Sequence, residues 1–294
     1  MGRPSLGVVF DADLGNTIDD ALALAMLFGL QGKGEARVLS VSTTRSSLKS
    51  AIFADILVRF YTGEPNTFAG PIPIGLSLSA AGAADTPMVD AVTAKPYPHA
   101  IAKMNDTADP VALIRNALSA QFDQNAVVVL AGPATNLAGL LSLPGARDLI
   151  AQKVKFLAMA SDAQSAADPG ALQRLTAEWP TEIVTVPAAV GDAVPFPGAS
   201  IDKDFAWSTA HPLVDAYRAN RSMPYDAPAL AMAVALYAVR PQESYWKLSA
   251  PAARQRTLAF DAAQKDRIQQ AYTELASTKP VGRVQRFRPP AKKD

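Results

Sequence analysis

Four carboxylates follow a short apolar stretch near the start of the chain. Residues 6–10 form a continuous apolar run typical of a buried strand. The acids that follow lie within ten residues of one another: Asp11, Asp13, Asp19 and Asp20. Carboxylates crowded in this way either raise one another's pKa or bind a cation, and oxygen ligands favour a hard cation such as Ca²⁺ or Mg²⁺. The cluster therefore predicts a metal site at the carboxyl end of a strand.

The residues after the first two acids predict a turn and then a helix. Gly15 and Asn16 supply the turn, and the stretch from Asp19 onward is rich in Ala and Leu. Asp19 and Asp20 would open this helix, where the macrodipole and the free N–H groups favour negative charge. Two aspartates alone at this position would be explained as a helix cap. Four acids at one strand-to-helix junction instead favour a functional site.

The segment of residues 8–24 resembles the N-terminal signature of the inosine-uridine preferring nucleoside hydrolase family. In that signature Asp-x-Asp is followed by Asp-Asp and an Ala/Leu-rich helix. The commoner form has about three residues between its second and third Asp, whereas this chain has five, residues 14–18, as in a Gly-Asn-containing variant. The order of the acids is the same.

Two later segments resemble further landmarks of the same family, in the same order. Residues 127–138 are similar to its central strand, turn and helix, where the backbone carbonyl before a Gly is a metal ligand, and this position is Ala131. Residues 223–241 resemble its C-terminal element, whose Asp is the last metal ligand, and this position is Asp226. The resemblance thus implies an α/β fold with a mostly parallel twisted sheet flanked by helices.

The activity implied by the resemblance is hydrolysis of the N-glycosidic bond of a ribonucleoside to ribose and free base. The transition state is oxocarbenium-like, so an activated water and contacts to the ribose hydroxyls are needed. Asp13 is the expected general base, and Asp11 would orient the loop or a ligand. The resemblance implies that Ca²⁺ is the cofactor and that its ligands are Asp13, Asp20, the Ala131 carbonyl and Asp226.

The resemblance also implies contacts to the substrate. Asp19 would hydrogen-bond the ribose, with Asn16 as a helper. Asp162 and Gln164 stand where a common form of the family has a Glu-x-Asn that holds the ribose. Tyr225 stands where the family often has a His that acts on the leaving base. A small nucleoside is therefore the expected partner.

These departures leave a second hypothesis open. Asp162 is a shorter acid and Gln164 a longer amide than the family's usual pair, and Tyr225 replaces an imidazole. Residues 43–45, Thr-Thr-Arg, replace the family's usual Gly-Asn. A catalytically weak or inactive protein of the same fold that binds a ribosyl ligand is therefore the alternative.

A second enzyme class also opens on a strand followed by Asp-x-Asp. In the haloacid-dehalogenase-type phosphatases the first Asp is a nucleophile and the second an acid, and Gly-Thr usually follows at once. Here residues 14–16 are Leu-Gly-Asn, and the Asp19-Asp20 pair comes too early to be that family's distal metal motif. This phosphatase hypothesis is the less favoured one.

Short apolar strands alternate with helical stretches along the chain, which predicts a mostly parallel sheet with crossover helices. In such a sheet ligands bind beyond the carboxyl ends of the strands, where Asp11, Asp13 and Ala131 fall. We expect strands at residues 6–11, 37–43, 126–131, 154–160 and 182–187. We expect helices at residues 19–31, 47–62, 109–121, 134–142, 168–178 and 226–239.

The length of the chain is enough for one large domain. With 294 residues and 49% hydrophobic content, it can bury about three-quarters of its unfolded surface. We expect a single domain over residues 1–294 that ends in a basic tail at residues 285–294. Residues 254–260 and 283–288 alternate like strands.

Several residues outside the motifs allow two interpretations. Residues 76–98 are rich in Ser, Ala, Gly and Pro and predict a long loop, either a lid that excludes water from the crevice or an ordinary surface loop. The two histidines, His99 and His211, are expected to be structural. Phe205 and Trp207 could stack on a base or pack in the core.

Charge and composition exclude several classes of partner and site. The net charge of +1 gives no electrostatic case for a nucleic-acid or membrane-surface partner, and no apolar run is long enough to span a membrane. The chain has no cysteine, which excludes disulfides, thiolate metal sites and cysteine nucleophiles. No leader is visible, so the cytoplasm is the default expectation, with periplasm or secretion open if a leader was removed. A homo-oligomer is compatible with the sequence.

Overall fold

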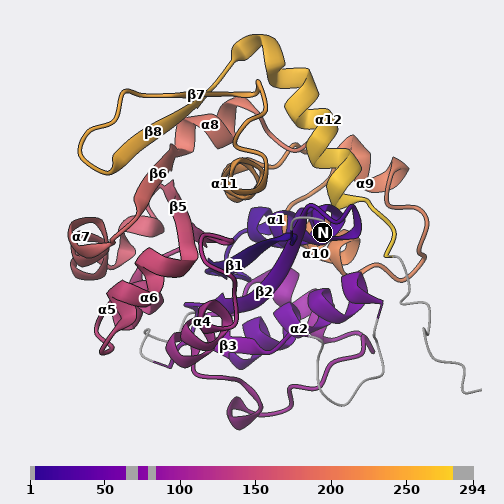
Figure 1. The fold of residues 1–294 in the computed structure, drawn as a ribbon. Coiled ribbons are helices and arrows are strands. Elements are labelled where there is room, and N and C mark those ends of the chain that lie inside the picture. The colour runs from indigo at the N-terminus through magenta and orange to yellow at the C-terminus, as the bar shows by residue number, and fades with distance from the viewer. Residues whose placement is uncertain (1–3, 64–71, 79–83, 281–294) are drawn as a thin grey trace, which may run out of the picture.

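The computed structural model describes residues 4–63, 72–78 and 84–280, and in them one sheet runs through the molecule (Figure 1). Its strand order is β3-β2-β1-β4-β5-β6-β8-β7. Neighbouring strands are parallel except for the edge pair β7 and β8. The strands are β1 (Leu6–Ala12), β2 (Ala36–Thr43), β3 (Ile74–Leu76), β4 (Ala126–Ala131), β5 (Val154–Ser161), β6 (Glu182–Pro187), β7 (Trp246–Leu248) and β8 (Gln255–Phe260).

Helices cover both faces of this sheet. Side chains alternate along a strand, so Val8 and Phe10 of β1 pack into one apolar core and Val9 into the other. The first core is built with α1 (Ile18–Gly32), α2 (Leu48–Thr62), α3 (Pro87–Thr93), α10 (Pro212–Asn220), α11 (Leu230–Val239) and α12 (Lys265–Ala276). The second is built with α4 (Pro110–Ser119), α5 (Thr135–Leu141), α6 (Ala146–Lys153) and α7 (Pro169–Glu178). The remaining short helices are α8 (Ala188–Ala193), α9 (Ala199–Lys203), and the 3₁₀ turns η1 (Met104–Asp106), η2 (Ser165–Ala167) and η3 (Ala262–Gln264).

Helix α11 lies at the centre of the larger core. Its residues carry no charge and nine of them are buried, as a helix that is apolar on all sides must be. It packs on β4 and β5 and against α1. The helix that carries Asp19 and Asp20 is therefore fixed by an element from the far end of the chain.

Parallel pairing brings the ends of three strands to one edge of the sheet. Asp11 of β1 lies beside Ser42 of β2 and Leu130 of β4, and Ala12 lies beside Ala131. The loops after β1, β2 and β4 consequently meet at that edge, as expected for the ligand-binding edge of an open α/β sheet.

The predicted elements are largely present, with one shifted boundary. The five expected strands appear within a residue or two, and residues 254–260 form β8. The expected helix at 226–239 begins only at Leu230, so Asp226 lies in an extended segment that bridges to Phe196. Pro228 contributes to this late start, because a proline disfavours the helical conformation of the residue before it. Residues 283–288 and the predicted tail at 285–294 lie outside the described residues.

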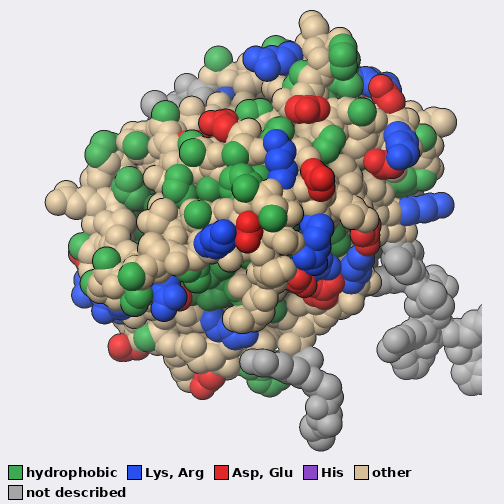
Figure 2. Space-filling model, turned by 90° about the horizontal axis from the view of Figure 1, so that it is seen from above, with side chains coloured by type: hydrophobic (Ala, Val, Ile, Leu, Met, Phe, Trp, Pro, Cys, Tyr) green, Lys and Arg blue, Asp and Glu red, His purple; other side chains and the backbone are tan. Residues whose placement is uncertain are grey.

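The distribution of charged side chains on the surface agrees with the net charge of +1. Lys and Arg side chains are interspersed with Asp and Glu on the face seen in Figure 2. Within the described ranges, none of the helices is both long and apolar enough to cross a membrane.

Candidate active site

A cavity of about 450 Å³ opens at the carboxyl edge of the sheet. Its walls come from the loop and first turn of α1, the ends of β4 and β5, and the segment between α10 and α11. This volume is within the range of small-molecule sites, about 300–1,000 Å³. The predicted site residues that line it are Asn16, Asp19, Asp20, Ala131, Asp162 and Tyr225.

Asp11 is the most deeply buried acid of the cluster. It is fully buried, and its Oδ1 accepts hydrogen bonds from Ser42 Oγ at 2.6 Å and Asn136 Nδ2 at 2.9 Å. Its Oδ2 has no partner among the described residues. Burial raises the pKa of Asp11 to about 7, while the two hydrogen bonds act in the opposite direction. The sequence does not predict Asn136 as a site residue; its only signal is an amide side chain in the turn after an apolar strand, and such an amide needs polar partners once it is buried.

Asp13 and Asp20 form the central pair. Asp13 follows β1, Asp20 lies in the first turn of α1, and both are buried. Burial raises the pKa of both carboxyl groups; for Asp20, repulsion by Asp13 and by Asp19 raises it further. A hydrogen bond between the two carboxyl groups lowers the pKa of Asp13 and raises that of Asp20. Two acids in this state can share a proton or a cation.

Asp19 has a structural contact that the sequence did not predict. Its Oδ2 accepts the backbone N–H of Ala231, and its Oδ1 that of Met232 at 3.2 Å. These N–H groups belong to the first turn of α11. The N-cap residue of that helix, Ala229, has no side chain that could accept them. Burial raises the pKa of Asp19 to about 7, although the hydrogen bonds from the backbone N–H groups lower it. The predicted ribose contact would have to share these oxygens.

Asp226 does not join the other predicted metal ligands. It is exposed, and its Oδ1 accepts the N–H of Gly198 at 2.8 Å. Backbone hydrogen bonds between Phe196 and Ala227 pair the segment that contains Asp226 with the one that contains Phe196. Side chains alternate in direction along such an extended segment, so Asp226 lies on the face opposite to that of Tyr225 and Ala227, which line the cavity. The pairing is close, because a Cβ on Gly198 would lie 1.8 Å from the Tyr225 carbonyl oxygen.

The oxygen donors that do converge are fewer than a four-ligand calcium site needs. The described residues contain no group of three His, Cys, Asp or Glu side chains that could hold one ion. Asp20 and Ala131 line the cavity, while Asp13 is not a lining residue but contacts Asp20 from the end of β1. The side chains of these acids and the carbonyl of Ala131 are hard oxygen donors, and the Oδ2 of Asp11 is buried without a partner among the described residues. This set fits a hard cation that keeps part of its water shell.

The two residues that replace the family's Glu-x-Asn are placed differently. Asp162 lines the cavity just past β5, and its Oδ1 accepts the N–H of Ser165 at 2.9 Å. Gln164 is exposed in the same turn and does not line the cavity. Of these two residues, only Asp162 is placed to reach a ligand in the cavity.

Tyr225 is held rigidly against Tyr217. The rings stack at 4.4 Å, the hydroxyl of Tyr225 donates to the Tyr217 carbonyl, and the hydroxyl of Tyr217 donates to the Tyr225 carbonyl, both at 2.7 Å. Burial raises the pKa of Tyr225. A phenol whose proton is already donated and whose pKa is raised is a poor acid for a leaving base.

Residues 76–98, for which a lid and an ordinary surface loop were the two interpretations, do not line the cavity in their described part. Residues 84–98 include α3, and none of the described residues of this stretch lines the cavity. Thr86 Oγ1 instead donates to the Gly15 carbonyl at 2.7 Å, so this segment supports the loop behind the acid cluster.

The histidines lie away from the cavity, as expected for structural residues. His211 is 2% exposed among the rings of Phe60, Phe205 and Trp207, and burial lowers its pKa to about 4. Phe205 therefore packs in the core and Trp207 lies half-buried against Phe60 and His211, and neither lines the cavity. The Nδ1 of His99 lies 2.9 Å from the Ile101 carbonyl oxygen.

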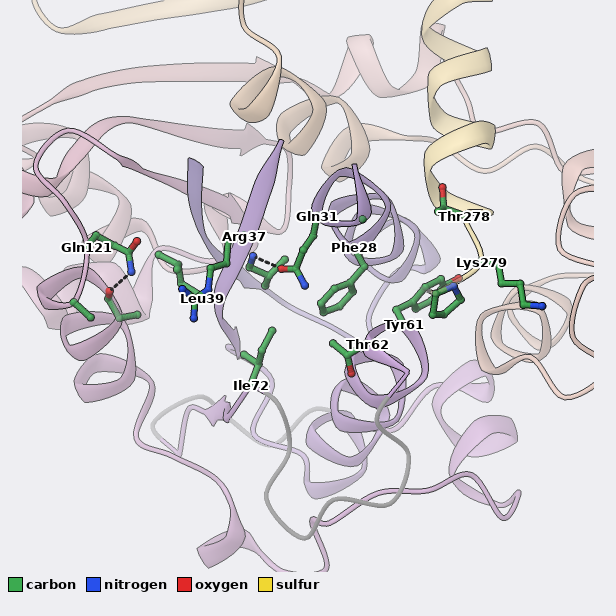
Figure 3. A pocket seen from close by; sticks show the side chains of 15 residues that line it. Phe28, Gln31, Arg37, Leu39, Tyr61, Thr62, Ile72, Gln121, Thr278 and Lys279 are labelled. Atoms are coloured by element: carbon green, nitrogen blue, oxygen red, sulfur yellow. Dashed lines mark hydrogen bonds between the residues drawn. The ribbon is translucent and has the colours of Figure 1, made fainter. Parts of the chain in front are cut away.

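A second cavity, of about 380 Å³, lies at the amino end of β2 (Figure 3). Its polar side chains include Gln31, Arg37 and Lys279, and it has no acid among its lining residues. The chemistry of the acid cluster is thus confined to the opposite edge of the sheet.

Comparisons with known proteins bear on the fold. No protein-family model matches the sequence, and no curated protein matches it. The type III effector protein XopQ, complexed with adenosine diphosphate ribose, is similar with a TM-score of 0.74 at 12% identity, over 95% of this chain and 96% of that chain. The plant nucleoside hydrolase PpNRh1 is similar with a TM-score of 0.67 at 17% identity, over 94% and 99% of the two chains. The inosine-uridine preferring nucleoside hydrolase from Bacillus anthracis is similar with a TM-score of 0.64 at 16% identity, over 92% and 99%. The chain therefore has the fold of the nucleoside hydrolases, which confirms the predicted α/β architecture.

Proposed function

We propose that the chain hydrolyses the N-glycosidic bond of a ribonucleoside or related riboside in the cavity beside Asp13 and Asp20. The observation that carries this proposal is the pair of buried carboxyl groups at the carboxyl edge of a nucleoside-hydrolase fold. A cavity of about 450 Å³ accommodates a small ligand but not a nucleic acid duplex.

Asp13 acts as the general base. Its carboxylate takes a proton from water, the water oxygen attacks the anomeric carbon, and the electron pair of the broken C–N bond passes to the base nitrogen. The departing nitrogen takes its proton from solvent, because Tyr225 donates its own proton to a backbone carbonyl. The charge of the aspartates around the cavity stabilises the oxocarbenium character of the ribose.

A divalent cation, with Ca²⁺ as the first candidate, completes the site in this proposal. Asp13, Asp20 and the carbonyl of Ala131 would hold it. When bound, such an ion lowers the pKa of water and orients the ribose hydroxyls. Asp162 would then contact the ribose from the end of β5.

The second candidate is a protein that binds a ribosyl ligand without turning it over. It is favoured by the two oxygens of Asp19, which are already used by α11, and by the likeness to XopQ, whose structure holds adenosine diphosphate ribose. In this case the same cavity would bind a nucleoside or a ribose-derived ligand intact.

The deciding experiment measures reducing-sugar release from a panel of nucleosides and from p-nitrophenyl riboside. The chelator-stripped chain is assayed with Ca²⁺ and with Mg²⁺, and Asp13→Asn is the inactive control. We expect ribose release that requires Asp13. Intact nucleoside in a soaked crystal, without release from any substrate, would favour the binding protein. Hydrolysis of p-nitrophenyl phosphate with Mg²⁺ would favour the phosphatase hypothesis.

A further inference from the structure

Arg45 is a buried cation that lies just past the end of β2. It is 9% exposed, its Nη1 donates to Asn16 Oδ1 at 3.1 Å, and its Nη2 donates to the carbonyl of Ala84. Its Nε has no partner among the described residues. The guanidinium group is permanently charged and attracts the carboxylate of Asp13.

Asn16 connects this cation to the proposed general base. Its Nδ2 donates to Asp13 Oδ2 at 2.8 Å, while its Oδ1 accepts from Arg45. A guanidinium can only donate and a carboxylate can only accept. Arg45 and Asp13 together therefore fix the orientation of the Asn16 amide, with its oxygen toward Arg45 and its nitrogen toward Asp13. Either neighbour alone would fix this orientation less firmly.

The backbone of this loop is held by other contacts. The N–H of Asn16 donates to the Asp13 carbonyl at 2.9 Å, Gly15 has a φ of +94°, and Thr86 Oγ1 donates to the Gly15 carbonyl. None of these contacts uses the side chain of Arg45. Loss of the guanidinium group should therefore free the side chains of Asn16 and Asp13 to change orientation, while the backbone of the loop keeps its conformation.

We propose that Arg45 is a positioning residue that orients the carboxylate of Asp13 through the amide of Asn16. This inference rests on the proposed hydrolysis, and it gives a role to the Thr-Thr-Arg stretch where the family resembled by the sequence has Gly-Asn. With Arg45 in place, the Oδ2 of Asp13 stays bonded to Asn16, which fixes the orientation of the carboxylate. A general base must be held to within a fraction of an ångström to be effective.

The first test compares kcat and KM for an activated riboside among Arg45→Met, Asn16→Ala and the double variant. Arg45→Met should lower kcat by roughly tenfold, since misplacement of about 1 Å can cost up to about 100-fold. The KM should change less than about twofold, because Arg45 does not line the cavity. The double variant should be no slower than Asn16→Ala, because both side chains act in one chain of contacts.

Two further variants separate positioning from simple support of the fold. Arg45→Lys keeps the charge and one donor nitrogen, and it should recover part of the lost kcat. Arg240→Met is the matched control, since Arg240 makes a bidentate pair with Glu35 at 2.8 Å and does not line the cavity. It should leave kcat unchanged. Equal kcat in Arg45→Met and the parent, or losses that multiply in the double variant, would overturn the inference.

A crystal structure of Arg45→Met gives a readout that does not depend on turnover. The Nδ2 of Asn16 should leave the Oδ2 of Asp13, while the backbone of residues 13–17 stays in place. An unchanged contact near 2.8 Å would overturn the positioning role. If the parent chain releases no sugar from any riboside, the proposed hydrolysis fails, and this crystal structure alone decides the inference.

Discussion

The carboxylate of Asp19 lies at the N-terminus of α11, where its Oδ1 accepts the N–H of Met232 at 3.2 Å. The two residues are 213 positions apart in the chain, so an acid of the predicted site also joins the first helix to a late one. A carboxylate is well suited to this position, because the first N–H groups of a helix have no partner within it and attract negative charge.

The first prediction follows from this contact. Asp19→Ala should lower the free energy of unfolding by about 2 kcal/mol, because it leaves buried N–H groups of α11 without an acceptor. Asp19→Asn keeps one acceptor oxygen and should lose less. Urea unfolding of the three proteins measures both effects. Cation affinity should survive in Asp19→Ala; its loss together with stability would place Asp19 among the metal ligands.

The convergence of the first acids could be predicted from the sequence because it depends on local rules. An apolar run followed by Asp11 and Asp13 indicates a strand end, and parallel sheets bring strand ends to one edge. Ala131 was placed at that edge on the same grounds. The helix that presents Asp20 was likewise visible from its composition.

The direction of other side chains depends on distant pairing that spacing does not encode. Asp226 faces away from the cavity because its segment pairs with Phe196, and Asn136 reaches Asp11 across 125 positions. In the sequence, Arg45 stands out only as a departure from the family's Gly-Asn. Its contact with Asn16 requires the loops after β1 and β2 to be side by side.

The second prediction concerns the cation. Calorimetry on chelator-stripped protein should show one Ca²⁺ site, and Asp20→Asn should weaken it by roughly 100-fold or more, since even residues that only support ligands contribute about 10- to 100-fold. Asp226→Asn is the informative comparison and should bind almost as well as the parent, because Asp226 contacts Gly198 instead. Equal losses in both variants would restore Asp226 to the ligand set.

The third prediction uses the buried histidine. The pKa of His211 is lowered to about 4 in the folded chain, so between pH 6.5 and 4 the unfolded chain binds a proton that the folded chain does not. Its contribution to stability is therefore complete above pH 6.5 and falls as the pH drops, by up to about 3 kcal/mol. Comparison of urea unfolding with His211→Leu at pH 7 and pH 4.5 isolates this effect from the carboxylates. A parent and a variant with parallel pH profiles would refute it.

The last prediction concerns the leaving group. An imidazole titrates near neutrality and can protonate a departing base, whereas Tyr225 has a raised pKa and donates its proton to the Tyr217 carbonyl. General acid catalysis contributes about 10²- to 10⁴-fold, so its absence should slow substrates whose base leaves badly. We expect measurable release of p-nitrophenol from p-nitrophenyl riboside and much slower hydrolysis of inosine or uridine. Tyr225→Phe should barely change the rate with the activated riboside. Natural nucleosides that turn over as fast as this substrate, or a phenylalanine variant that loses both activities alike, would show that protonation of the base is not what limits this site.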